Sequence, residues 1–177
     1  YYEYKIQKNS DLILLQTNRD KQIFSKLFFS KKSVSIPNLP QIKTNNSKFK
    51  HKSGIGWCAS FTGAYLNLSL WFLNKILIPF LKENTDCRIH LLGSNSKIFL
   101  DKIIYIYPKY HINFILEPYH KDITIFFQAR TFVLSPIYKG YGLINRTIEA
   151  MYYGCIVVGD PRAFNGIKRA KNGVNCY

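Results

Sequence analysis

The chain has 177 residues, of which 47% are hydrophobic and 16% are aromatic. This content excludes a disordered protein, and the length suits one domain, or one domain with a piece of another. The 25 Lys and Arg residues exceed the 10 Asp and Glu residues, so the formal net charge is +15. A charge of this size raises the question of contact with nucleic acid or with an acidic membrane surface.

Both ends of the sequence suggest a part of a longer protein. It opens at Tyr1 rather than at a methionine, and it ends soon after the turn-like pair Asn172-Gly173. The four cysteines are widely spaced and form no Cys-x-x-Cys pair. We therefore expect them to be small core residues rather than zinc ligands or disulfide partners; they are Cys58, Cys87, Cys155 and Cys176.

Short apolar runs alternate with helix-like segments along the chain. Several runs show little polar alternation, which is typical of strands buried on both faces of a parallel sheet. The predicted strands are Asp11–Thr17, Val34–Ile36, Ile55–Ser60, Arg88–Gly93, Ile112–Leu116, Thr131–Ile137 and Cys155–Gly159. The predicted helices are Asn67–Lys82, Lys97–Tyr107, Asp122–Ala129 and Leu143–Tyr153. This alternation predicts an α/β fold with a doubly wound, Rossmann-like parallel sheet.

The first of these helices follows a long uncharged stretch. We expect Asn67 to cap its N-terminus and Pro79 to kink it near its end. The uncharged stretch, Ser53–Asn74, is long enough to raise the question of a membrane span. Its glycines, and the change of apolar period within it, favour a strand, a loop and the start of a helix instead.

The basic residues are concentrated before residue 54. Residues 1–53 hold 11 Lys and Arg residues against 3 acidic residues, a net charge of +8. Within them, residues 39–53 predict a basic linker, and residues 1–38 a small strand–helix–strand unit that is too short to fold alone. Such a flank suits peripheral contact with an anionic membrane, although a composition rich in Lys, Asn, Ile and Tyr also results from AT-rich coding. Nucleic-acid binding would require a recognised motif, and the sequence contains none.

The stretch Ser135–Gly154 carries the most chemical information. A strand leads into the glycine-containing loop Gly140–Gly142 and then into a helix, whose first N–H groups can bind a diphosphate. Glu149 lies two turns into this helix and can accept hydrogen bonds from both hydroxyls of a ribose. Arg146, one turn earlier, can pair with Glu149 or reach a phosphate. Alternatively, the glycines only shape a turn, and Arg146 and Glu149 form a surface ion pair.

The segment Gly142–Val158 resembles the signature of group 1 (family 4) glycosyltransferases, which have the GT-B fold. Ser60-Phe61 resembles the opening of the same nucleotide-binding domain, and Ile112–Glu117 and Val133–Pro136 follow in the expected order. The resemblance implies the C-terminal half of a GT-B fold in residues 54–177, truncated at its C-terminus. Residues 1–38 then correspond to a remnant of the N-terminal acceptor domain.

The resemblance also implies a function. It is the transfer of a sugar from a nucleotide-sugar donor to an acceptor, usually with retention of configuration and without a metal or other cofactor. The catalytic residues of the acceptor domain would be absent, so we expect the isolated chain to be inactive. Such a protein is cytoplasmic or peripheral to a membrane. The implied donor-binding residues are Ser60, Phe61, Glu117, Pro118, Tyr119, Gly140, Tyr141, Gly142, Asn145, Arg146 and Glu149, of which Glu149 would hold the ribose.

Three positions depart from the family pattern. Tyr141 stands where many members have a second glutamate, and Ser60 and Tyr65 stand where many have an arginine and a lysine. These departures leave open a diverged, non-catalytic GT-B-like binding module. A basic nucleic-acid-binding domain is a third alternative. The four histidines share no motif, and we expect each to be a surface or strand-end residue rather than a catalytic base; they are His51, His90, His111 and His120.

Overall fold

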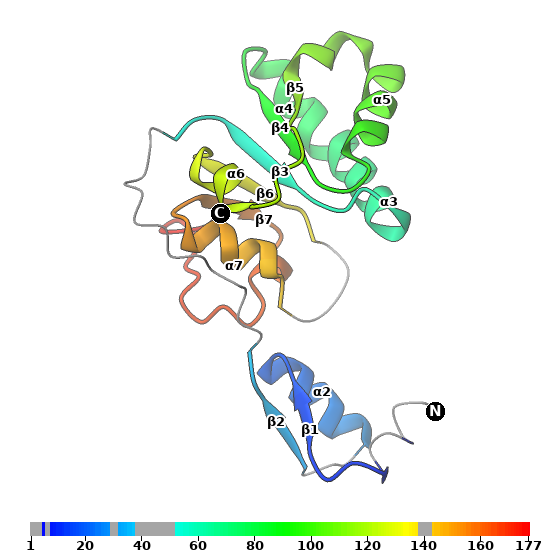
Figure 1. Ribbon diagram of the computed structural model, residues 1–177, viewed down its shortest axis with the longest axis vertical. Coiled ribbons are helices and arrows are strands. Elements are labelled where there is room, and N and C mark those ends of the chain that lie inside the picture. Colours follow the sequence, from blue (N-terminus) through cyan, green and yellow to red (C-terminus); the bar gives the residue numbers. More distant parts are fainter. Residues whose placement is uncertain (1–4, 6–7, 29–31, 38–51, 138–142) are drawn as a thin grey trace.

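A computed structural model describes residues 5, 8–28, 32–37, 52–137 and 143–177 (Figure 1). Its larger unit contains five parallel strands, β3 (Ile55–Cys58), β4 (Ile89–Leu92), β5 (Phe114–Leu116), β6 (Phe132–Ser135) and β7 (Ile156–Gly159). Their order in the sheet is β5-β4-β3-β6-β7. The first strand of the unit therefore lies at the centre, and the chain winds outward from it in both directions. This order confirms the predicted doubly wound, Rossmann-like sheet.

The smaller unit contains the parallel pair β1 (Ile13–Leu15) and β2 (Ser33–Ser35), connected by α2 (Asn18–Phe28). It confirms the strand–helix–strand pattern predicted before the linker, and it is drawn in blue in Figure 1. The Thr17 hydroxyl accepts a hydrogen bond from the Asp20 N–H at 3.0 Å, which caps α2. Residues 38–51, most of the predicted linker, lie outside the described residues.

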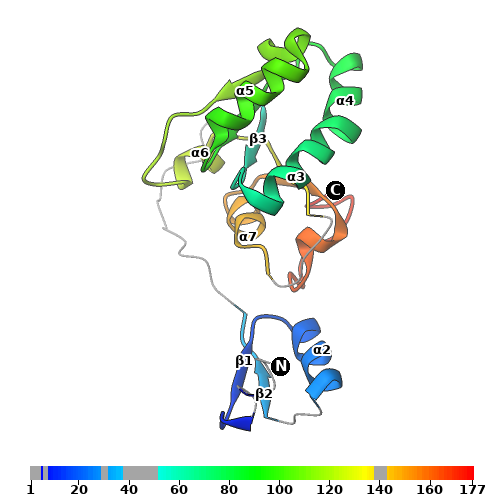
Figure 2. The ribbon, with the colours of Figure 1, turned by 90° about the vertical axis from the view of Figure 1, so that its right-hand side faces the viewer.

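Helices cover both faces of the five-stranded sheet (Figures 1 and 2). One face packs against a long helical segment and α5 (Ser96–Ile106), and the other packs against α6 (Thr124–Gln128) and α7 (Asn145–Tyr152). The long segment comprises α3 (Gly63–Phe72), a π-helical turn (Leu73–Leu77) and α4 (Ile78–Glu83). Two 3₁₀ helices complete the unit, Pro108–Asn113 and Pro161–Phe164.

Alternation along β3 divides the core into two layers. Trp57 is completely buried on the face of α3, α4 and α5. Its ring contacts those of Phe61, Phe72 and Phe99 edge-on, with centroids 5.5, 5.4 and 5.3 Å away. The next residue, Cys58, packs against the opposite layer, which α6 and α7 cover. The sheet is therefore buried on both faces, as its unbroken apolar strands predicted.

The long helix corrects the prediction of its N-cap and shows how the chain accommodates Pro79. It begins at Gly63 with Thr62 at the N-cap position, so Asn67 lies inside the helix and does not cap it. The π-helical turn comes just before Pro79, where a regular helix would bring the proline ring against a carbonyl group one turn earlier.

The continuous helix Gly63–Glu83 has 21 residues, and an 18-residue window within it has a mean hydropathy of 1.3, which is sufficient in length and composition to cross a membrane. It is the only such helix among the residues that the structure describes. Leu73, Leu77 and Leu81 on this helix are buried in the core against the sheet. The segment therefore forms one layer of the α/β fold, in agreement with the strand, loop and helix predicted for this stretch.

Candidate functional site

Two adjoining cavities lie at the carboxyl edge of the sheet, where the strand order reverses beside β3. Ligands of doubly wound sheets bind at this position. A cavity of about 440 Å³ lies among the ends of β3 and β6 and the start of α7. A second cavity, of about 610 Å³, lies among the ends of β4 and β5, α6 and α7. Both are lined by Cys58, Gly93, Ser94 and Arg146, so the two cavities form one continuous candidate site.

The helix α7 is fixed to the sheet by a buried pair of hydroxyl groups. Thr147 is completely buried, and its Oγ1 lies 2.9 Å from Oγ of Ser135 at the end of β6. This hydrogen bond holds the first turn of α7 against the strand that precedes it. The N-terminus of α7, where Asn145 and Arg146 line the smaller cavity, is thereby oriented toward the candidate site.

We expect Thr147→Val to lower the free energy of unfolding by about 1–3 kcal/mol, because it leaves the buried Ser135 hydroxyl without this partner. Urea unfolding followed by circular dichroism measures the change. The double variant Ser135→Ala/Thr147→Val removes both polar groups, so it should recover a large part of the loss. A double variant as unstable as the sum of the two single variants would contradict this role of the hydrogen bond.

Arg146 and Glu149 form the ion pair that the sequence predicted as one alternative. The Arg146 Nη1 donates to the Glu149 Oε2 at 2.6 Å. The Glu149 side chain is only 12% exposed and lines the larger cavity, whereas the Arg146 side chain is 51% exposed and reaches both cavities. The carboxylate is therefore held inside the site by a guanidinium group that is itself half exposed.

The residues after β3 present hydroxyl groups to the smaller cavity. The Ser60 Oγ lies 3.0 Å from Oγ1 of Thr62 and 2.8 Å from Oγ of Ser94. Tyr65 also lines this cavity. Ser60 and Tyr65 stand where many group 1 (family 4) glycosyltransferases have an arginine and a lysine, and here they contribute neutral polar groups to the cavity. Among the described residues that line this cavity, Arg146 is the only cation.

The other predicted site residues fall into three groups. Glu117 and the 89% exposed Tyr119 line the larger cavity, and Pro118 between them is exposed. The Phe61 side chain is 1% exposed and stacks on Phe99 in the core, with ring centroids 4.4 Å apart, so only the backbone of Phe61 is left for the predicted donor contact. A ligand cannot reach this ring. Three predicted residues lie outside the described residues, namely Gly140, Tyr141 and Gly142.

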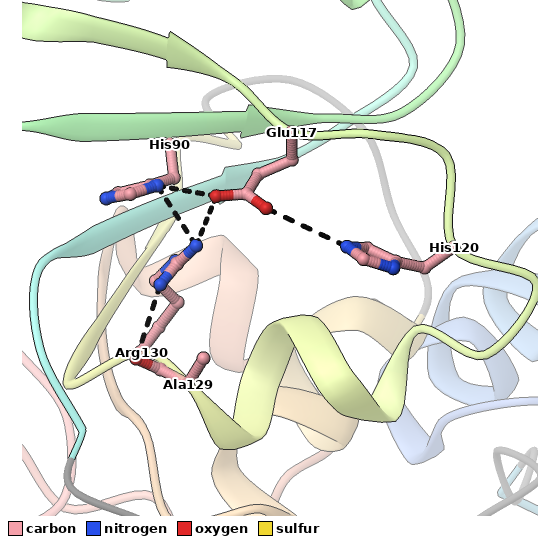
Figure 3. A network of polar contacts seen from close by, with 5 residues as sticks. All are labelled: His90, Glu117, His120, Ala129 and Arg130. Atoms are coloured by element: carbon pink, nitrogen blue, oxygen red, sulfur yellow. Dashed lines mark hydrogen bonds and ion pairs between the residues drawn. The ribbon is translucent and has the colours of Figure 1, made fainter.

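A partly buried polar network, which the sequence analysis did not predict, lies beside the larger cavity (Figure 3). The Arg130 Nη2 donates to the Glu117 Oε1, and His90 Nδ1 lies 2.6 Å from the same oxygen. The His120 Nε2 lies 3.7 Å from the other carboxylate oxygen. Burial alone would raise the pKa of Glu117, but the hydrogen bond from His90 and the charge of Arg130 outweigh it and hold the pKa below its ordinary value of 4.5. Ionised Glu117 therefore stabilises the fold above pH 4.5, and this contribution to stability is lost as the pH falls through the lowered pKa of the carboxylate.

The network was missed because its members are far apart in the sequence. His90 lies on β4, Glu117 follows β5, and Arg130 lies between α6 and β6. His90 and His120 were expected to be strand-end or surface residues, and neither forms part of a recognisable motif. One signal was present in the sequence: Arg130 stands just before a buried strand, where an unpaired charge is costly.

The cysteines are free thiols, and none of them forms a metal site in the part of the chain that is described. Cys58 lies at the end of β3 and lines both cavities. Burial raises the pKa of its thiol to about 11, although the charge of Arg146 partly offsets this effect. The Cys58 side chain is therefore neutral at physiological pH, which makes it a poor nucleophile.

The fold is shared with proteins whose solved structures contain UDP. Over 99% of its length the chain superposes on S. aureus TarM with a TM-score of 0.77, at 16% identity and covering 35% of that chain. Over 98% of its length it superposes on the pneumococcal O-GlcNAc transferase GtfA with a TM-score of 0.74, at 17% identity and covering 35% of that chain. HepE of Anabaena gives a TM-score of 0.71 over 97% of this chain, at 15% identity and covering 50% of that chain. The fold is that of a GT-B Rossmann-like half.

Sequence comparison adds one distant relative. An uncharacterized 44.6 kDa protein in the cps region of Klebsiella pneumoniae is 27% identical over 92 residues, which are 50% of this chain and 24% of that protein. No family model matches the sequence. The chain therefore spans about a quarter of this relative and about a third to a half of the GT-B structures on which it superposes.

Proposed function

We propose that this chain is the donor-binding, C-terminal half of a glycosyltransferase resembling group 1 (family 4), which transfers a sugar from a nucleotide-sugar to an acceptor. The observation that carries the proposal is the position of Glu149. Its carboxylate lines the same cavity as the loop that begins at Glu117, at the carboxyl edge of a GT-B-type sheet. The TarM, GtfA and HepE structures include complexes with UDP, which supports a uridine nucleotide as the first ligand to test.

The two cavities suit the two ends of such a donor. Glu149 can accept hydrogen bonds from vicinal hydroxyls of a ribose, and the loop at Tyr119 provides an exposed aromatic ring near the same cavity for a base. The smaller cavity, with Arg146 and the N-terminus of α7, suits the diphosphate and the sugar. A departing nucleoside diphosphate gains negative charge, and Arg146 would stabilise that charge.

A nucleoside diphosphate should raise the melting temperature of the full 177-residue chain. At a ligand concentration of 100 times Kd the expected stabilisation is about 2.7 kcal/mol, which corresponds to about 5–10 °C for a domain of this size. Glu149→Ala should abolish the shift, because it removes the acceptor for the ribose hydroxyls. Differential scanning fluorimetry with UDP, GDP and ADP measures both effects.

Glu83→Ala is the matched control for this experiment. Glu83 is an exposed glutamate at the end of α4 and lines neither cavity of the candidate site. This variant should keep the full shift. No shift of the unmodified chain with any of the three nucleotides, or an undiminished shift in Glu149→Ala, would contradict the proposed function.

A second candidate, a non-catalytic GT-B-like binding module, is favoured by the hydroxyl groups after β3. Ser60 and Tyr65 provide no positive charge to the smaller cavity, so less of the leaving-group charge would be neutralised there. The two candidates differ in turnover by the full-length protein. Release of nucleoside diphosphate from a nucleotide-sugar identifies the transferase, whereas binding without release identifies the module. Membrane contact through residues 1–53 and a cytoplasmic location stay predictions from the sequence.

A further inference from the structure

Arg130 is a buried cation beside the candidate site. It lies just after α6, and the whole residue is only 8% exposed. Its Nη2 donates to Glu117 and lies 3.0 Å from Nδ1 of His90, and its Nη1 lies 3.4 Å from the carbonyl oxygen of Ala129 (Figure 3). A guanidinium group in this position loses most of its hydration, so its location depends on the partners that the fold provides.

The fold leaves room for this side chain by means of a glycine in the central strand. A Cβ atom at Gly56 of β3 would lie 3.1 Å from Cγ of Arg130 and 2.8 Å from the ring of Phe126. The same ring lies under the guanidinium group, with Cζ of Arg130 5.3 Å from its centroid. Strand β3, helix α6 and Arg130 are therefore packed together closely, and the position of the guanidinium group is well defined.

Through Glu117, Arg130 holds the start of the loop that borders the larger cavity. Glu117 is the first residue after β5, and its N–H also donates to the carbonyl of Leu91 at 2.9 Å. The far end of the loop is held as well, because the Asp122 carboxylate accepts from the N–H of Thr124 at 3.0 Å. Between these two anchors, Tyr119 and His120 line the cavity.

The carboxylate of Glu117 is used mainly for this anchoring. Its Oε1 receives the donors of Arg130 and His90, and its Oε2 is oriented toward His120. A buried ion pair of this kind adds little to stability compared with a well-packed apolar replacement. Its effect is geometric, because it fixes where the loop leaves the sheet.

We propose that Arg130 is a positioning residue for the nucleotide base: by holding Glu117 it fixes residues 117–122 as the wall of the cavity that faces Glu149. This inference rests on the proposed function. The ribose and the diphosphate would be bound by α7, whereas the polar partners of Arg130 are His90, Glu117 and Ala129, none of which lies on α7. The loss of Arg130 should therefore weaken binding of the base and leave binding of the sugar-phosphate part unchanged.

Two ligands that differ only in the base separate these contributions, namely UDP and ribose 5-diphosphate. Isothermal titration calorimetry on the full chain gives Kd for both. In Arg130→Met the affinity for UDP should fall about tenfold, the effect that outer residues have when they orient binding groups. The affinity for ribose 5-diphosphate should stay within about twofold of its original value. Arg130→Lys keeps the charge and should recover part of the affinity for UDP.

Three further variants make the result decisive. Glu149→Ala should weaken both ligands alike, because both contain the ribose hydroxyls. Lys97→Met breaks an exposed ion pair with Asp101 on α5, outside the cavity, and should change neither affinity. If Arg130→Met does not fold, Glu117→Gln keeps the shape of the side chain while removing its charge, and the same selective loss of UDP affinity is expected.

The possible failures can be distinguished. Equal weakening of UDP and ribose 5-diphosphate in folded Arg130→Met, or unchanged affinity for UDP, would overturn the positioning role while leaving the proposed function intact. If the unmodified chain binds neither ligand, both the proposed function and this inference are overturned.

Discussion

Gly93→Ala should lower the free energy of unfolding by about 4 kcal/mol or more, a loss that requires backbone strain or a major packing defect. Gly93 follows β4 and has a φ of +130°, which side chains rarely adopt. A Cβ atom there would lie 1.9 Å from the carbonyl oxygen of Ala59 and 2.9 Å from its carbon. Both contacts are with backbone, so no rotation of a side chain can relieve them. Urea unfolding monitored by circular dichroism measures the loss.

Gly173→Ala is the matched control for the steric part of this effect. Gly173 also has a positive φ, +77°, but a Cβ atom there would have no neighbour within 4 Å. Only the conformational cost remains, about 1–2 kcal/mol. Equal losses in the two variants would show that the approach of Gly93 to Ala59 has no energetic consequence. Because Gly93 lines both cavities, a stable Gly93→Ala protein should also show an altered affinity for UDP.

Trp57→Ala should cost about 3–5 kcal/mol, the range observed when a large buried aromatic residue is truncated. Trp57 is fully buried in the central strand and contacts three aromatic rings from the loop after β3, α3 and α5. Its removal leaves a cavity at the centre of one core layer. Neighbouring rings belong to rigid elements and cannot fill the space completely.

Trp71→Ala is the control for the loss of Trp57. Trp71 lies on α3 and is 42% exposed, so its truncation should cost less than about 2 kcal/mol. Equilibrium urea unfolding of both variants gives the difference directly. A loss at position 57 no greater than that at position 71 would contradict the central place of Trp57 in the core.

The strands could be predicted from the sequence because parallel strands buried on both faces are continuous apolar runs. All seven predicted strands are present. The start of the long helix could not be predicted as accurately. Asn67 resembles an N-cap, but Leu66, which precedes it, already packs against the core on the sheet, and the helix begins at Gly63. Tertiary contacts thus outweigh the local capping preference.

The candidate site was predictable where it depends on one continuous segment. Arg146 and Glu149 lie one turn apart on a helix, so their pairing follows from helical geometry. The network of Arg130 and Glu117 depends on three strands and a helix that meet only in the folded sheet, and no local pattern indicates it. A resemblance of sequence identifies a position but not the direction of its side chain, and the Phe61 ring lies in the core.

The ion pair between Arg146 and Glu149 has a consequence for ligand selectivity under the proposed function. A nucleoside without phosphates that hydrogen-bonds to Glu149 would compete with Arg146 for its carboxylate and would offer the guanidinium group no anion in return. A nucleoside diphosphate takes the same carboxylate and supplies an anion to the displaced Arg146. The guanidinium group would then exchange one anionic partner for another. Under the proposed function, the resting site would thereby discriminate against nucleosides that carry no phosphate.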